Sequence, residues 1–281
     1  IIHFSPIKMV IHPKHCSFAH LDIILLTERI PLDLTKWVND GFTLGFYDGM
    51  PVFVLGGIPG EKIICEIYEE STKFKKAKVI QVINESPLRI SPPCKIYLNC
   101  GGCYFQHIDY RTEREIKHNL ILENFKYSGL IDKDKIIDIQ YIHSKEYHYR
   151  NNAQLKIKNG KRGFFKIKSN EIIDLPSNGC LLLREELNNY LADRSLSIPE
   201  GKIRLDTEGV KLYMMEASKY LIKNKEILLP KNSFFQINSE LIEVWLDHIV
   251  NYSGESENIL ELFSGVGTIS IFLMDIHKSL D

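Results

Sequence analysis

Apolar and polar residues alternate over several short stretches between residues 32 and 90, and this two-residue period is typical of β-strands. Glycine, proline and aspartate turns at residues 48–49 and 59–61 separate these stretches. The strand candidates cover residues 41–45, 51–55, 62–68 and 77–83. With about five strands in so short a segment, we expect a small closed β-barrel of the oligonucleotide-binding type.

Two later stretches have helical periodicity. Apolar residues recur within residues 110–125 with charged residues between them, and Gly129 supplies a stop signal. Residues 241–250 place Ile242, Trp245, Leu246 and Ile249 on one helical face. Between the two predicted helices, the pattern indicates mixed strands up to about residue 229.

The last patterned segment has four apolar residues around Glu261 at residues 259–263, turns at Gly265-Val266-Gly267 and is mostly apolar again at residues 269–274. This order predicts a buried strand, a tight turn and the start of a helix, as in the first βα unit of a nucleotide-binding fold. Two glycines are weak evidence, because the third glycine of the dinucleotide fingerprint is absent. A tight turn without a ligand remains an alternative.

Composition limits the class of protein. The chain has 281 residues, of which 44% are hydrophobic and 25% are charged, as in folded proteins with about two domains. No apolar run approaches the roughly 20 residues that a bilayer requires, and residues 1–31 form a leader without an export signal. We therefore expect a reducing, cytoplasmic location in which disulfides are rare.

Cysteine spacing is the strongest chemical signal. Cys94, Cys100 and Cys103 form a C-x5-C-G-G-C pattern that concentrates three soft ligands, so the sequence predicts a metal site that lacks one ligand. Cys180, which follows an Asn-Gly turn, is the preferred fourth ligand. The other two cysteines, Cys16 and Cys65, are rivals. An iron-sulfur cluster fits this spacing better than zinc, whose ligands usually come in two C-x2-C pairs, but zinc and buried thiols remain alternatives.

Positive charge is concentrated although the net charge is −1. Residues 141–170 carry eight Lys or Arg residues, one acid, and the aromatic residues Tyr147, Tyr149, Phe164 and Phe165. The alternation predicts a hairpin that turns at Asn159-Gly160, with charges on one face and rings on the other. Such a hairpin suits RNA, because charges meet phosphates and rings stack on bases. A solvated hairpin with core aromatics is the alternative.

The order of motifs resembles the RNA uracil-5-methyltransferase family, in particular its iron-sulfur members that act on 23S ribosomal RNA. The motifs are a barrel containing Pro-Gly-Glu, the cysteine pattern followed by Gln106-His107, Phe-Phe-Gln-Ile-Asn at residues 234–238, and Glu-Leu-Phe-Ser-Gly-Val-Gly at residues 261–267. The resemblance covers residues 32–281. It implies a multidomain α/β fold: an OB-like TRAM barrel at 32–90, a central α+β iron-sulfur domain at 91–230, and the start of a Rossmann-like class I methyltransferase domain at 231–281.

The resemblance also implies a set of site residues. Cys94, Cys100, Cys103 and Cys180 would hold a 4Fe-4S cluster with a structural role. Gln236, Phe263 and Thr268 fall where the family contacts S-adenosyl-L-methionine, and Gly265 and Gly267 form the turn beneath that cofactor. Glu261 and Ser264 replace the Asp and Cys that family members often have. Neither exchange removes a group expected to be catalytic.

The reaction that the resemblance implies adds a cysteine thiolate to carbon 6 of uracil, so that carbon 5 can attack the sulfonium methyl group. In the family, the nucleophile and the base lie well downstream of the glycine turn. Only fourteen residues follow Gly267 here. We therefore expect a C-terminally truncated chain that contains no catalytic residue and is inactive alone. The expected partner is RNA, ribosomal rather than transfer RNA, with no obligate protein partner.

Two other classes of protein were weighed. A radical methylthiotransferase also joins an iron-sulfur cluster to a TRAM-like barrel, but its C-x3-C-x2-C pattern is absent. A non-catalytic RNA-binding protein with an iron-sulfur or zinc site would need only the barrel and the basic hairpin. Weak RNA binding that falls steeply with salt would fit the second alternative.

Overall fold

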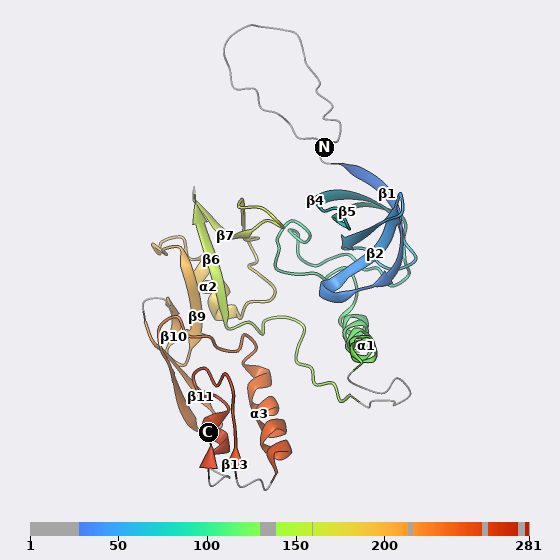
Figure 1. The fold of residues 1–281 in the computed structure, drawn as a ribbon. Coiled ribbons are helices and arrows are strands. Elements are labelled where there is room, and N and C mark those ends of the chain that lie inside the picture. Colours follow the sequence, from blue (N-terminus) through green and yellow to red (C-terminus); the bar gives the residue numbers. More distant parts are fainter. Residues whose placement is uncertain are drawn as a thin grey trace, which may run out of the picture.

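The structure is a computed structural model that describes residues 28–129, 139–158, 160–212, 216–254, 258–274 and 279–280. Residues 1–27, which make up most of the predicted leader and include Cys16, lie outside the described residues, as does the predicted turn residue Asn159. The central sheet lies beside the N-terminal barrel, and the C-terminal elements lie below that sheet in the view of Figure 1. Among the described residues, no helix combines the length and the apolarity needed to cross a membrane.

A closed five-stranded barrel forms the N-terminal part of the protein, as the sequence predicted. Neighbouring strands follow the order β1-β2-β3-β5-β4; only β3 and β5 pair in parallel. The strands are β1 (Arg29–Trp37), β2 (Phe42–Tyr47), β3 (Met50–Leu55), β4 (Lys62–Glu70) and β5 (Lys75–Asn84), with a 3-10 turn η1 (Asn39–Gly41) between β1 and β2. β1 begins before the predicted start of the barrel at residue 32.

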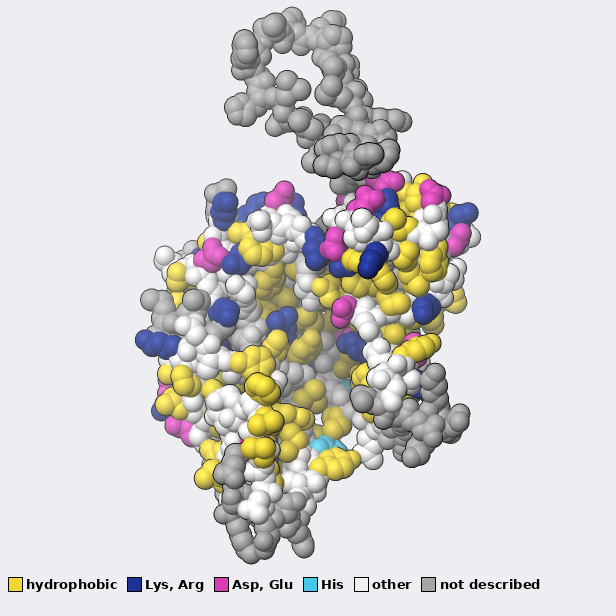
Figure 2. Space-filling view, viewed as in Figure 1, with side chains coloured by type: hydrophobic (Ala, Val, Ile, Leu, Met, Phe, Trp, Pro, Cys, Tyr) yellow, Lys and Arg dark blue, Asp and Glu magenta, His cyan; other side chains and the backbone are white. Residues whose placement is uncertain are grey.

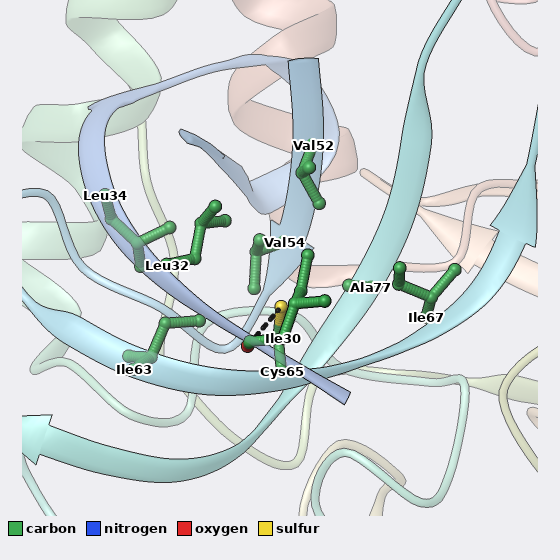
Figure 3. Close-up of a cluster of buried hydrophobic side chains, with 9 residues drawn as sticks. All are labelled: Ile30, Leu32, Leu34, Val52, Val54, Ile63, Cys65, Ile67 and Ala77. Carbon is green, nitrogen blue, oxygen red and sulfur yellow. Dashed lines mark hydrogen bonds between the residues drawn. The ribbon is translucent and has the colours of Figure 1, made fainter. Parts of the chain in front are cut away.

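Alternating side chains of these strands fill the barrel, as Figure 3 shows for nine of them. Cys65 is fully buried there, and its sulfur donates a weak hydrogen bond of 3.6 Å to the carbonyl of Ile30. Burial raises the pKa of the Cys65 thiol to about 11, so this thiol is protonated and unreactive at neutral pH. Cys65 is therefore part of the hydrophobic core, and its position argues against a role as the fourth metal ligand.

The first predicted helix is confirmed as α1 (Tyr110–Ser128). Asp109 caps its N-terminus by accepting a hydrogen bond of 2.8 Å from the backbone N–H of Thr112. Gly129 ends the helix in the left-handed conformation with φ of 70°. Ile116 packs with Ile58 and Ile108, which joins α1 to the barrel.

A five-stranded antiparallel sheet follows, in the order β10-β9-β6-β7-β8. Its strands are β6 (Asn152–Lys158), β7 (Lys161–Phe165), β8 (Ile172–Asp174), β9 (Gly201–Asp206) and β10 (Gly209–Leu212). The short helix α2 (Glu185–Ala192) packs against the sheet, and Leu155, Leu187 and Ile203 form the centre of the shared core. The mixed-strand prediction for this region missed α2.

The C-terminal part contains the hairpin of β11 (Ser218–Ile222) and β12 (Lys225–Leu229), followed by α3 (Glu240–Ser253). α3 confirms the second predicted helix. After it come β13 (Asn258–Ile259), α4 (Ser270–Leu273) and β14 (Ser279–Leu280), and β13 pairs in parallel with β14. Phe235 and Leu246 lie in a core against which Val266 and Ile269 pack.

The predicted strand before the glycine turn, within residues 259–263, is present but short. Only the first of these residues belongs to β13, and Leu260, Leu262 and Phe263 are 67%, 69% and 102% exposed. Among the described residues, β13 has a single strand neighbour, so no second layer covers the side chains that follow it. The strand–turn–helix order is present in reduced form, and a complete Rossmann-like domain stays a prediction.

Candidate functional site

The cysteine loop, residues 91–109, is held in shape by its own backbone and side chains. The N–H of Cys94 donates to Oε1 of Gln106 at 3.1 Å, and the N–H of Cys100 donates to the carbonyl of Ile96 at 2.9 Å. Gln106 is buried. The two hydrogen bonds therefore fix the backbone at the first and the last cysteine of the C-x5-C segment.

One side of the cysteine loop contacts the central sheet. The N–H of Gly101 donates to the carbonyl of Phe165 at 3.3 Å, and the N–H of Ile167 donates to the carbonyl of Asn99 at 2.9 Å. Cys100 forms an isolated antiparallel bridge with Lys166. The loop therefore extends the end of β7, which places its thiols beside the basic hairpin.

The other side of the cysteine loop contacts the barrel through His107. Nδ1 of this fully buried ring lies 2.6 Å from the hydroxyl of Tyr97, and Nε2 lies 3.1 Å from the carbonyl of Gly57. A carbonyl only accepts, so Nε2 carries the proton. Burial lowers the pKa of His107 to about 4, although the hydrogen bond to Gly57 opposes this shift; Arg89 lowers the pKa slightly further and Glu61 raises it slightly. His107 is therefore a neutral structural residue at pH 7.

We expect the stability of the protein to fall on acidification because of His107. Its pKa is about 4 in the folded state against an ordinary value of 6.5, so between these values the unfolded chain binds the extra proton. Stability is therefore full above pH 6.5 and is reduced by about 2 kcal/mol at pH 5. Urea unfolding at pH 7 and pH 5 checks this loss. His107→Asn should reduce the change in the free energy of unfolding between pH 7 and pH 5. An equal change in the two proteins would contradict the assignment of the pH dependence to His107.

A buried ion pair fixes the chain where it leaves the barrel. Nε and NH2 of Arg89 donate to the two carboxylate oxygens of Glu61 at 2.6 and 2.5 Å, and Glu61 also accepts from the N–H groups of Ile58 and Ser86. The Glu61 side chain is 0% exposed. Although burial opposes it, hydrogen bonding to Arg89 and these N–H groups keeps the pKa of Glu61 below its ordinary value. The sequence analysis identified Glu61 only as part of Pro-Gly-Glu and missed Arg89, 28 residues away.

Cys180 is positioned by a turn and by α2. Gly179 has φ of 78°, and a side chain there would lie 2.5 Å from Oδ1 of Asn188. Asn188 accepts from the N–H of Cys180 at 2.9 Å and donates to its carbonyl at 3.0 Å. Glycine before Cys180 is therefore required by the close approach of α2, which supports the turn predicted from sequence.

All four predicted ligands line one cavity of about 650 Å³ between the cysteine loop, the barrel and the central sheet. The fold therefore places Cys180 in the same cavity as the three loop cysteines, although it follows Cys103 by more than seventy residues in the chain. Within the described ranges, however, no three Cys, His, Asp or Glu side chains are gathered closely enough to hold a metal ion as they stand. The metal centre thus stays a prediction, supported by the shared cavity.

The electrostatics of these thiols suit a bound cation. Burial and, to a smaller extent, the neighbouring cysteines raise the pKa of Cys103 to about 12, although a hydrogen bond with Gln106 opposes them. The pKa values of Cys100 and Cys180 are also raised, first by burial and then by the other cysteines, while Arg150 acts in the opposite direction. These thiols are therefore protonated at neutral pH, and a bound metal group would supply the positive charge that their ionisation to thiolates needs. The donor set fits an iron-sulfur cluster on these grounds.

The basic hairpin forms as predicted, but its two faces differ from the prediction. Phe164 packs in the core, whereas Phe165 is exposed on the charged face, with Nζ of Lys156 5.0 Å from its ring centre. Two consecutive residues of a strand point to opposite faces, so the two rings could not lie on one face. Arg162 is used structurally, since it donates to the carbonyls of three residues near the end of α2. Lys and Arg side chains lie along the upper rim of the protein, where this hairpin faces the barrel (Figure 2).

The predicted cofactor residues lie together in the C-terminal part, away from the cysteine cavity. Gly265 and Gly267 have φ of 62° and 73°, so the turn adopts the left-handed geometry that favours glycine. Phe263 has φ of 62°, which is uncommon for a bulky residue. Thr268 is half-buried beside the turn. Glu261 accepts a hydrogen bond from the hydroxyl of Ser270, which closes the turn.

Gln236 is joined to this region by its neighbours. Phe235, which precedes it, shares a core with Val266 and Ile269 from the glycine turn. The buried Asn151 donates to the carbonyl of Gln236 at 2.9 Å and to that of Ile237 at 3.0 Å through its backbone. Asn151 therefore positions the Phe-Phe-Gln-Ile-Asn segment against the central sheet, a role that the sequence analysis missed because nothing in the local pattern marks it.

Comparisons with known proteins place the chain among the relatives of RNA methyltransferases. It is 30% identical over 251 residues to an uncharacterised RNA methyltransferase of Bdellovibrio bacteriovorus, covering 88% of this chain and 62% of that protein. A second uncharacterised RNA methyltransferase, from Leptospira interrogans, is 27% identical over 87% of this chain and 64% of its own length. The chain thus spans less than two thirds of these relatives. No family model matches it.

More specific relatives are uracil-C5 methyltransferases. The 23S rRNA (uracil(1939)-C(5))-methyltransferase of Aliivibrio fischeri is 24% identical over 90% of this chain and 69% of that protein. The crystal structure of Pyrococcus abyssi tRNA (uracil-54, C5)-methyltransferase in complex with S-adenosyl-L-homocysteine shares the fold, with a TM-score of 0.58 and 21% identity over 86% of this chain and 70% of that one. These findings confirm the resemblance that the motifs indicated.

Proposed function

We propose that the full-length protein methylates carbon 5 of a uridine in RNA, with 23S ribosomal RNA as the substrate and S-adenosyl-L-methionine as the methyl donor. The observation that carries the proposal is the extent of the similarity to RNA methyltransferases, which reaches 88–90% of the chain. The chain also carries a closed barrel of the type that binds nucleic acids, a basic hairpin and a glycine turn.

S-adenosyl-L-methionine supplies an electrophilic methyl group when it is bound. Gln236, Phe263 and Thr268 are the proposed contacts, with Gly265 and Gly267 beneath the cofactor. The turn fits this role because its left-handed glycines let the backbone approach a ligand without side-chain interference. The fully exposed ring of Phe263 and the neighbouring Gln236 segment provide the adjoining surface.

The proposed reaction needs a thiolate that adds to carbon 6 of uracil, and a base that later removes the proton from carbon 5. None of the five described cysteines suits this role, because four line the cysteine cavity and Cys65 is buried in the barrel. We propose that these four thiols hold a 4Fe-4S cluster that joins the cysteine loop to the turn before Cys180. Methyl transfer is redox-neutral, so the proposed role of the cluster is structural.

Analysis of ribosomal RNA from cells with and without the protein tests the function. We expect one 5-methyluridine of 23S rRNA to be lost when the protein is removed, as measured by mass spectrometry of RNA fragments. Loss of 5-methyluridine from transfer RNA instead would assign the other substrate. Unchanged methylation of both RNAs would favour the alternative, a non-catalytic RNA-binding protein with an iron-sulfur or zinc site.

For the chain of residues 1–281, we expect salt-sensitive RNA binding without methyl transfer. The barrel and the hairpin supply the binding surface, whereas the described residues supply no thiol at the glycine turn. Incubation with a 23S rRNA transcript and radiolabelled S-adenosyl-L-methionine measures the transfer. Label in the RNA above the level of a protein-free control would contradict this expectation.

A further inference from the structure

A single carboxylate links the barrel to the basic hairpin at the cysteine cavity. Oε1 of Glu69 on β4 lies 3.0 Å from Nζ of Lys76 on β5, and Oε2 lies 3.3 Å from Nζ of Lys168 in the turn after β7. Both lysines line the cavity. Two cations from separate parts of the fold therefore converge on one pair of anionic oxygens.

Aromatic rings extend from this point across the outer surface of the barrel. Nζ of Lys76 lies 5.4 Å from the ring centre of Phe74. The ring of Phe74 meets that of Phe53 edge to face at 5.7 Å, and Phe53 meets Phe42 in the same way at 6.4 Å. Because Phe53 and Lys76 are paired directly across β3 and β5, the rings and the cation share one face. A cation beside successive ring faces is the arrangement that single-stranded nucleic acid uses for its phosphates and bases.

The cavity beside Glu69 also contains polar groups without partners. The hydroxyl of Tyr68 and Nε of Arg150 are buried and have no hydrogen-bond partner among the described residues, and both residues line the cavity. Buried polar groups are normally satisfied, so each of these groups has the capacity to bind a ligand atom.

We propose that Lys76 and Lys168 form a phosphate-binding site for single-stranded RNA, which Glu69 occupies in the RNA-free protein, and that Phe74 and Phe53 stack on the adjoining bases. A carboxylate and a phosphodiester both present two anionic oxygens, so a phosphate can replace Glu69 between the same two ammonium groups. The pair is partly exposed, and such pairs hold their partners weakly. The choice of RNA as ligand rests on the proposed function, whereas the site itself rests on these contacts.

Binding of a fluorescein-labelled oligouridylate to the chain, measured by fluorescence anisotropy over a range of salt concentrations, tests the site. Glu69→Gln frees both lysines, so we expect Kd to fall roughly 3- to 10-fold and the salt dependence to steepen by roughly one unit of the log–log slope. Glu226→Gln is the matched control: it changes the net charge equally and removes the partner of Lys219 on the C-terminal hairpin. It should change Kd less than about two-fold, since its charge is remote from the RNA.

Two aromatic variants complete the test. Phe74→Ala should weaken oligouridylate binding roughly ten-fold through the loss of stacking, whereas Phe46→Ala, which removes a 57% exposed ring elsewhere on the barrel, should not. If Glu69→Gln binds no more tightly than Glu226→Gln, the site is wrong although the RNA function can still stand. If the unmutated chain binds no oligouridylate at low salt, RNA binding itself fails, and with it both proposals.

Discussion

Cys180→Ser should yield a colourless protein of greatly reduced stability. The proposed cluster depends on four thiols that line one cavity, and Cys180 alone among them comes from the central sheet region. Without it, the cluster would lose both a ligand and the link between the cysteine loop and α2. Because the free energy of metal binding contributes directly to folding, we expect a loss of several kcal/mol.

Anaerobic purification with iron and sulfide analysis measures this effect, together with urea unfolding. The unmutated chain should contain about four irons and four sulfides, and Cys180→Ser close to none. Cys65→Ala is the control, because Cys65 lies in the barrel core away from the cavity and its loss should leave the iron content intact. Stoichiometric zinc without sulfide would show that the cavity is a zinc site. An undiminished visible absorption in Cys180→Ser would exclude Cys180 as a ligand.

Glu61→Gln should destabilise the protein by about 3–5 kcal/mol, because it leaves the largely buried Arg89 without a carboxylate partner. The carboxylate accepts four hydrogen bonds of 2.5–3.2 Å, and two of them come from Arg89. Urea unfolding measures the loss. Glu70→Gln removes the exposed partner of Lys75 and should cost less than about 1 kcal/mol.

A double variant distinguishes the effect of an unpaired buried charge from the effect of replacing the whole ion pair. Glu61→Leu combined with Arg89→Met replaces both charges with apolar groups, and buried pairs replaced in this way often recover stability. We expect the double variant to be more stable than Glu61→Leu alone. A Glu61→Gln variant as stable as Glu70→Gln would show that the ion pair contributes little to the barrel.

The sequence predicted the barrel and the helices α1 and α3 because their signals are local. Alternating residues and glycine turns define β2 to β5, and the stop signal at Gly129 lies within one turn of the end of α1. Long-range partners had no such signal. The Glu61–Arg89 pair, the support of Gln236 by Asn151 and the contact of Lys168 with Glu69 join residues 28, 85 and 99 positions apart in the chain.

Burial was the less predictable property. A mostly apolar segment such as residues 259–263 forms a covered strand only if another layer packs on it, and the segment itself does not show whether that layer is present. The described residues place only β14 beside β13, and the leucines that follow are exposed. Similarly, the adjacent Phe164 and Phe165 had to lie on opposite faces, which the overall alternation of charges and rings concealed.

The attachment of the cysteine loop to the barrel has a consequence for the order of assembly during synthesis. His107 and the Glu61–Arg89 pair connect the cysteine loop to residues that precede the loop in the chain. The barrel and the three thiols of the loop therefore emerge from the ribosome as one unit before Cys180 is synthesised. Folding of N-terminal units first is the general rule for such chains. A carrier delivering the proposed cluster would therefore meet three thiols on the nascent chain before Cys180 and the last two strands of the central sheet, β9 and β10, are made.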